Sequence, residues 1–174
     1  MFVRQADVLP AGLAAELTLL LRALPFEPTP TGAGVAWTGA LQVPPTLDPQ
    51  HPGCLYRLLH FLDHTLPQRA AAWLGHPVVR ADAGLIPVWT FRKGGYLDAA
   101  GPLPGVEAWL GLTGGSWPAA WGGHLEILSE DGRLEATLPP GFATLDLVVQ
   151  QLIQVPVVTH HVEALWVRTL LVRP

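Results

Sequence analysis

Apolar residues recur along this chain with two different periods, a helical one in the first 75 residues and an extended one after them. Leucines return at helical spacing over residues 13–24, and Pro25 ends that pattern. A second helical stripe of leucines begins at Gly53 and runs past Pro67 to Leu74. Because proline donates no backbone hydrogen bond and clashes with the preceding turn, we expect Pro67 to kink or split this helix. The first part of the chain is therefore predicted to hold two amphipathic helices.

Beyond Gly75 the apolar runs are short and mostly bounded by glycine, proline or Asp131-Gly132, which predicts a hairpin turn. The predicted strands are residues 78–79, 85–92, 106–112, 124–128, 134–138, 143–153 and 157–172. Before them, residues 26–49 are rich in Pro, Thr and Gly, with one short strand expected near residues 35–37. Two helices followed by such strands predict an α+β fold, with helices covering one face of an antiparallel sheet or barrel.

The length of 174 residues predicts a single domain, with residues 1–75 as mainly helical support and residues 76–174 as the β core. Charged residues make up 14% of the chain, against roughly 25% in an average soluble protein. With 49% hydrophobic residues and seven tryptophans, much of the chain is interior or is covered by a partner.

The charge distribution excludes one class of partner. The net charge is −4 and the ten basic residues are scattered singly, so no basic stripe is available to nucleic acid. Cys54 is the only cysteine, which excludes an intrachain disulfide and a thiolate zinc cluster and fits a reducing compartment. Since we find neither a signal peptide nor a membrane span, we expect a cytoplasmic protein without membrane contact.

A series of spaced motifs occupies the second half of the chain. It comprises a glycine- and tryptophan-rich loop, a Gly-Gly-x-Leu strand, a Pro-Pro turn, apolar strands, a His-x-Val motif and a late arginine. In this chain the motifs are Gly122-Gly123-His124-Leu125, Pro139-Pro140, His160-His161-Val162 and Arg168. This order resembles the iron(II)/2-oxoglutarate dioxygenases of the prolyl-hydroxylase type, over roughly residues 85–174. The resemblance implies a double-stranded β-helix, a jelly-roll or cupin-like barrel, buttressed by the N-terminal helices.

The resemblance also implies roles for single residues. Adjacent strand residues point to opposite faces, so only one of His160 and His161 can face the barrel, and the His-x-Val pattern selects His160 as the iron ligand. Arg168 would hold the far carboxylate of 2-oxoglutarate, and Tyr96 would lie against the co-substrate. Taken without this context, His160 and Arg168 are ordinary strand residues satisfied by local partners.

The other half of the metal site is missing. A non-haem iron site needs two imidazoles and a carboxylate, and the family supplies two of them from a His-x-Asp pair. Alignment places that pair at Ala99 or Ala100 and at Gly101 or Pro102, so neither ligand is present.

Three residues could help His160 to hold a metal. Asp98 could turn inward, and His124 with Glu126 has the spacing that puts imidazole and carboxylate on one strand face.

We therefore predict a degenerate, non-catalytic dioxygenase-like protein, a pseudoenzyme, with no assigned catalytic residue or cofactor. Its former co-substrate pocket would bind a small dicarboxylate, a peptide or a protein partner. One alternative is a working hydroxylase that uses iron(II), 2-oxoglutarate and a non-standard ligand set. Another is a structural or assembly subunit, with a homo-oligomer as one form, whose tryptophans serve an interface.

Overall fold

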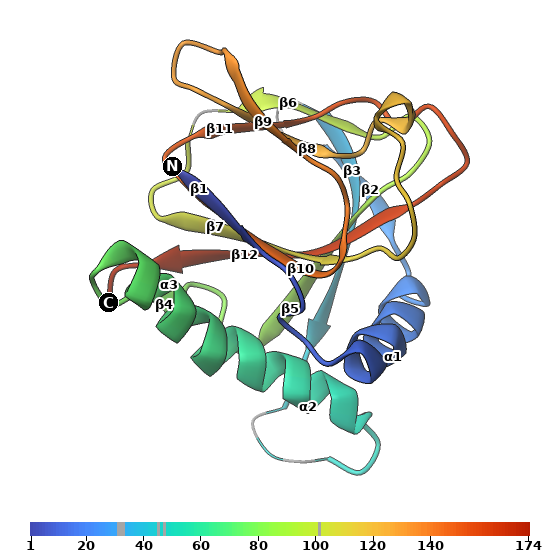
Figure 1. The fold of residues 1–174 in the computed structure, drawn as a ribbon. Coiled ribbons are helices and arrows are strands. Elements are labelled where there is room, and N and C mark those ends of the chain that lie inside the picture. Colours follow the sequence, from blue (N-terminus) through green and yellow to red (C-terminus); the bar gives the residue numbers. More distant parts are fainter. Residues whose placement is uncertain (31–33, 45, 47, 101) are drawn as a thin grey trace.

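The fold is a strongly curled antiparallel sheet with helices on one side. The computed structural model describes residues 1–30, 34–44, 46, 48–100 and 102–174. In this part of the chain, twelve strands belong to one sheet, in the order β1-β10-β7-β12-β5-β3-β6-β11-β8-β9, with β2 paired to β3 and β4 to β12. The sheet curls into a half-barrel, so that β6, β11, β8 and β9 lie over the other strands (Figure 1). The predicted jelly-roll class of fold is confirmed.

The strand bounds follow the alternation of apolar residues. The strands are β1 (Phe2–Gln5), β2 (Glu27–Pro30), β3 (Gly34–Gln42), β4 (Val79–Arg80), β5 (Leu85–Phe91), β6 (Tyr96–Ala100), β7 (Val106–Leu112), β8 (Leu125–Leu128), β9 (Leu134–Leu138), β10 (Phe142–Val149), β11 (Leu152–Val155) and β12 (Ala164–Val172). A short 3-10 helix, η2 (Ala119–Trp121), lies in the tryptophan-rich loop.

The two predicted helices are present and cover the outer face of the larger half of the sheet (Figure 1). The first is α1 (Ala11–Arg22), which ends before Pro25. The second is one rod made of α2 (Gly53–His60), a π-helical turn η1 (Phe61–Thr65) and α3 (Leu66–Leu74). It ends at Gly75, whose φ of +76° favours glycine. None of the described helices has the length and apolar character needed to cross a bilayer.

The helical rod of α2, η1 and α3 continues through Pro67, and the π-helical turn η1 comes directly before this proline. Proline cannot donate to the carbonyl four residues earlier, and a wider turn is one way to accommodate this loss. The same turn carries Asp63, whose Oδ1 lies 2.7 Å from Nε of Arg80 on β4. Arg80 is 6% exposed and also donates to the carbonyl of Leu85 at 2.7 Å, so this ion pair ties the helical rod to the sheet.

Two apolar cores lie on the two faces of the sheet. Odd-numbered residues of β12, such as Leu165 and Val167, belong to the core under the helices. Even-numbered ones, such as Ala164 and Trp166, belong to the core inside the barrel. Since neighbouring strand residues point to opposite faces, one strand contributes to both cores.

Two of the predicted strands are wrong in extent. Residues 143–153 form two strands, β10 and β11, because the chain turns at Gln150, which has φ of +49°. Residues 157–163 lie in a loop, and β12 begins only at Ala164. Pro156 cannot donate to a neighbouring strand, which favours the end of β11 at Val155. This second correction moves His160 out of the sheet.

Candidate functional site

Tryptophans fill the inside of the barrel. Trp109 on β7 and Trp166 on β12 are both fully buried, and their rings meet edge to face with centroids 6.0 Å apart. Trp89 on β5 packs against Trp109 at the same centroid distance. Neither buried indole N–H has a hydrogen-bond acceptor among the described residues. The interior is therefore packed with large aromatic rings, and the indole N–H groups of Trp109 and Trp166 make no hydrogen bond within the described residues.

Arg168 also points into the barrel, since it lies two residues after Trp166 on β12. Its guanidinium carbon lies 4.5 Å from the Trp89 ring centroid and 4.9 Å from that of Trp109. Both Nε and Nη2 donate to Oε2 of Glu107 on β7, at 3.0 and 2.8 Å. The Glu107 side chain is 10% exposed and that of Arg168 is 21% exposed. The guanidinium is thus held between two indoles and neutralised by a carboxylate of the chain itself.

A pocket of about 210 Å³ opens beside Arg168. Its lining is Ala81, Asp82, Pro87, Trp89, Leu103, Glu107, Arg168, Thr169 and Leu170. Thr169 donates a hydrogen bond to Asp82, so this acidic group also has a partner within the chain. An anion that approached Arg168 would meet two carboxylates and would have to displace Glu107.

The wall of the barrel that β6 and β11 form is apolar. Leu97 on β6 and the neighbouring Ile153 and Val155 on β11 belong to the inner core. Tyr96 is half-buried and Asp98 is exposed, and both lie on the strand face opposite to Leu97. The structure therefore does not bring Tyr96 or Asp98 together with Arg168.

The positions aligned with the missing iron ligands offer no replacement. Ala99 and Pro102 are exposed, and Gly101 lies outside the described residues. Within the described ranges, no three His, Cys, Asp or Glu side chains gather closely enough to hold a metal ion. An iron(II) ion needs imidazole and carboxylate ligands on one side of an open site, and the apolar wall of Leu97, Ile153 and Val155 does not fit it.

His160 was predicted to face the barrel from a strand, and that placement is wrong. It is exposed in the loop of residues 156–163, where its ring lies 5.6 Å from that of Trp121. Hydrogen bonds fix this loop, with Val158 bonded to Gly94 and Gly95 and with the Thr159 N–H donating to the Trp121 carbonyl at 2.9 Å. His160 therefore lies outside the inner core that contains Trp166.

His124 and Glu126 form a pair, but on the far side of their strand. Leu125 and Ile127 face the inner core, so His124 and Glu126 lie on the opposite side of the chain, where the His124 side chain is nevertheless buried. His124 Nε2 lies 3.1 Å from Glu126 Oε1, and Gln154 Nε2 donates to Glu126 Oε2 at 2.5 Å. The metal triad of His124, Glu126 and His160 is not formed.

Glu107 is a site residue that none of the sequence motifs indicated. It is the one charged residue in the seven residues of β7, all of which are buried. A buried charge requires a partner, and this requirement is the signal that could have singled it out. The partner itself lies 61 residues away in sequence.

Comparison with known proteins finds similarity in structure. No protein-family model matches the sequence, and none of the curated proteins matches it. One similar structure is a prolyl-4-hydroxylase from Pseudomonas putida, with 19% identity, a TM-score of 0.72, and coverage of 99% of this chain and 92% of that one.

Two other similar structures agree with it. A 2OG-Fe(II) oxygenase family oxidoreductase from Burkholderia pseudomallei has 14% identity, coverage of 99% and 86%, and a TM-score of 0.71. A Trichoplax adhaerens prolyl hydroxylase, in complex with a hypoxia inducible factor peptide fragment, has 13% identity, coverage of 98% and 83%, and a TM-score of 0.73. The curled sheet with its helical cover is therefore the fold of the prolyl-hydroxylase-like 2OG-Fe(II) oxygenases.

Proposed function

We propose that this chain is a non-catalytic protein with the dioxygenase fold, which acts by binding a partner and not by oxidising a substrate. The observation that carries this proposal is the filling of the barrel, where Trp109 and Trp166 are fully buried against an apolar wall. An oxygenase of this fold needs open positions for its co-substrate and for dioxygen. In this chain the barrel interior holds these tryptophans, and the pocket beside Arg168 is only about 210 Å³.

The arginine expected to anchor 2-oxoglutarate supports the same proposal. Arg168 donates two charge-assisted hydrogen bonds to Glu107. The Glu107 carboxylate therefore occupies the guanidinium in the way that a carboxylate of 2-oxoglutarate would. A dicarboxylate would have to break this pair and leave Glu107 buried without a partner, which is costly. We therefore place partner binding on the outside of the barrel and not at Arg168.

Anaerobic titration with iron(II), followed by 2-oxoglutarate and a measurement of succinate, tests this proposal. The Pseudomonas putida prolyl-4-hydroxylase, treated in the same way, is the positive control. We expect no stoichiometric iron and no 2-oxoglutarate turnover by this chain. One iron per chain together with succinate production would refute the proposal and support a working hydroxylase.

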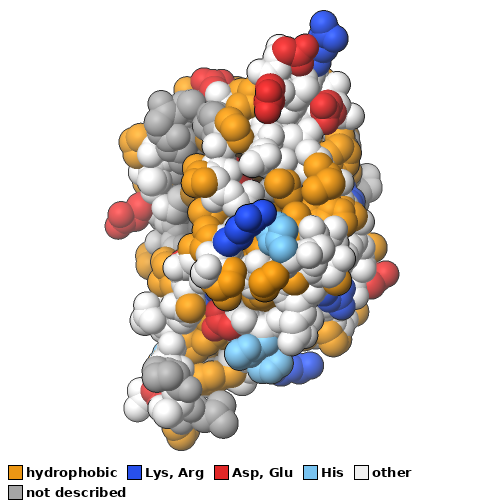
Figure 2. All heavy atoms as spheres, turned by 90° about the vertical axis from the view of Figure 1, so that its left-hand side faces the viewer, with side chains coloured by type: hydrophobic (Ala, Val, Ile, Leu, Met, Phe, Trp, Pro, Cys, Tyr) orange, Lys and Arg blue, Asp and Glu red, His pale blue; other side chains and the backbone are white. Residues whose placement is uncertain are grey.

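The partner is tested separately by sedimentation at several protein concentrations. The low charge content favours a covered surface, and Figure 2 shows hydrophobic side chains spread over one face of the molecule, so we keep self-association as a prediction. A sedimentation coefficient that rises with concentration would identify a second copy as the partner. A concentration-independent monomer would direct the search to other ligands.

A further inference from the structure

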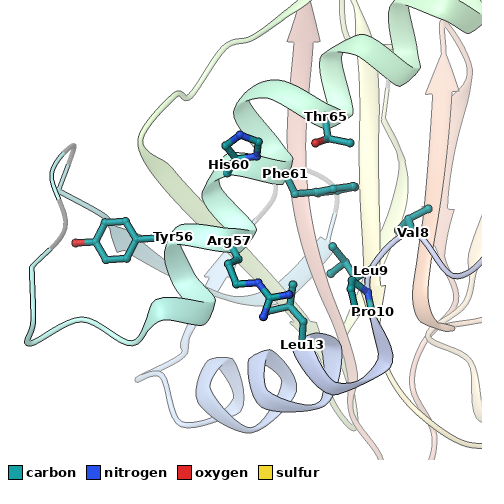
Figure 3. A pocket seen from close by; sticks show the side chains of 9 residues that line it. All are labelled: Val8, Leu9, Pro10, Leu13, Tyr56, Arg57, His60, Phe61 and Thr65. Atoms are coloured by element: carbon teal, nitrogen blue, oxygen red, sulfur yellow. The ribbon is translucent and has the colours of Figure 1, made fainter.

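A second pocket, of about 500 Å³, lies on the helical side of the molecule, away from the barrel interior (Figure 3). One wall is the chain segment that enters α1, and the other is the α2 to η1 part of the helical rod. Its lining is Val8, Leu9, Pro10, Leu13, Tyr56, Arg57, His60, Phe61 and Thr65. A volume of this size is within the range of roughly 300–1,000 Å³ that is typical of small-molecule sites.

The floor of this pocket is apolar. Leu9, Leu13 and Phe61 are each 5–6% exposed and belong to the core under the helices. Phe61 points from the helical rod toward Val8 and Leu9 (Figure 3). The floor therefore offers a rigid apolar surface to a ligand, because its side chains are already held by the core behind them.

A single cation lies at the edge of this floor. Arg57 is one turn before Phe61 on the same helical face, and its side chain extends toward Leu13 (Figure 3). Among the described residues, no carboxylate is within 4.0 Å of its guanidinium. Asp63, on the same rod, is engaged by Arg80. The guanidinium is thus available to a carboxylate from outside the chain.

Besides Arg57, the polar residues of the lining are Tyr56, His60 and Thr65, and the Tyr56 hydroxyl is already hydrogen-bonded within the chain. The Tyr56 hydroxyl donates to the Thr46 carbonyl at 3.0 Å and accepts from the Asp48 N–H at 2.9 Å. In Figure 3 its ring points away from the pocket. Arg57 is therefore the main group for fixing the polar end of a ligand, with exposed His60 beside it on the rim.

We infer that this pocket binds a small amphiphilic carboxylate, an acid with an apolar tail. The tail lies on Leu9, Leu13 and Phe61, and the carboxylate takes two hydrogen bonds from Arg57. One guanidinium at the rim of an apolar floor matches one anionic group on an apolar body. This ligand would serve the proposed binding function, on which the inference rests. The pocket itself lies outside the barrel and does not depend on whether the barrel binds iron or 2-oxoglutarate.

Titration of the isotopically labelled protein with octanoate, followed by amide NMR, tests the inference, with octan-1-ol and acetate as matched probes. We expect saturable binding of octanoate, with shifts in residues 8–13 and 56–65. Octanol should bind at least about tenfold more weakly, because it lacks the charge that pairs with Arg57, and acetate should not bind because it lacks the tail.

Two variants locate the charge. Arg57→Gln should weaken octanoate binding by about tenfold, since the lost bond is charge-assisted but exposed. Arg69→Gln removes another exposed arginine of the rod, outside the pocket, and should leave binding unchanged. Absence of saturable octanoate binding, equal binding by Arg57→Gln and the unmodified chain, or shifts confined to other surfaces would each overturn the inference. Iron and 2-oxoglutarate turnover report on the barrel, so the two proposals can fail separately.

Discussion

The pair of Arg168 and Glu107 gives the sharpest test of how the barrel interior is used. Glu107→Ala removes the acceptor of two hydrogen bonds and leaves the guanidinium between Trp89 and Trp109 without its counter-charge. Removing one partner of a fully buried ion pair costs about 3–5 kcal/mol. Arg168 is 21% exposed and can recover part of this from water. We therefore expect a loss of about 2–3 kcal/mol in the free energy of unfolding.

Chemical denaturation of four proteins measures this effect: the unmodified chain, Glu107→Ala, Arg168→Met and the double variant. Since the pair acts as a unit, the double variant should be more stable than the sum of the two single changes predicts, by about 1–3 kcal/mol. For a chain of this length, the loss in Glu107→Ala corresponds to a fall in Tm of roughly 4–12 °C. Glu107→Gln keeps an acceptor oxygen and should lose only about 1 kcal/mol.

The same variant tests whether Glu107 stands in for a ligand. Glutarate should not bind the unmodified chain, because Arg168 is already paired. In Glu107→Ala it should bind and raise the Tm, and it should fail to do so in the double variant. A change in stability below about 0.5 kcal/mol for Glu107→Ala, within the range of ordinary surface substitutions, would refute the reasoning. So would equal glutarate binding by the unmodified chain and by Glu107→Ala.

Three further predictions concern other parts of the molecule. Burial raises the pKa of the Cys54 thiol above its usual value, with a smaller contribution from Glu16. Because the folded chain favours the neutral thiol, the raised pKa stabilises the fold fully at pH values below the ordinary thiol pKa. This stabilisation is lost as the pH rises through the raised pKa of the folded chain, so alkaline unfolding should begin at higher pH in Cys54→Ala. Trp166→Ala should cost about 3–5 kcal/mol in urea unfolding. Trp166→Phe should cost clearly less, because the indole N–H has no acceptor to lose. A Cβ at Gly122, where φ is +70°, would collide with the Val157 carbonyl, so Gly122→Ala should lower the Tm by more than Gly115→Ala, where φ is +89° and the space is open. Equal Tm values for the last two variants would contradict that account.

Most of the helical layer could be predicted from the sequence. The leucine stripes and the punctuation at Pro25 and Gly75 predicted both helices, because an amphipathic helix is encoded by residues three and four apart. The π-helical turn before Pro67 was not predicted. It carries Asp63, whose ion pair with Arg80 on β4 is a tertiary contact that the local helical pattern does not specify.

The strands were predicted less well where the chain turns inside an apolar run. Residues 143–153 have no glycine or proline, so the turn at Gln150 carries none of the usual signals. The same limit misplaced His160, because the apolar residues that follow Pro156 predicted a last strand over residues 157–172, whereas β12 begins only at Ala164. The exposed position of His160 follows from hydrogen bonds to two other loops, which no local pattern specifies.

The sequence by itself determined the two helices and the absence of a His-x-Asp pair, since each depends on residues close together in the chain. The jelly-roll class of fold was implied by the family resemblance of motifs spaced over residues 85–174. Only the tertiary structure decided that Arg168 is paired with Glu107 and that tryptophans fill the barrel. Alternation along a strand fixes which residues share a face. It does not fix which strands are neighbours or how they are aligned, and the register that sets Arg168 opposite Trp109 arises only when the whole sheet closes.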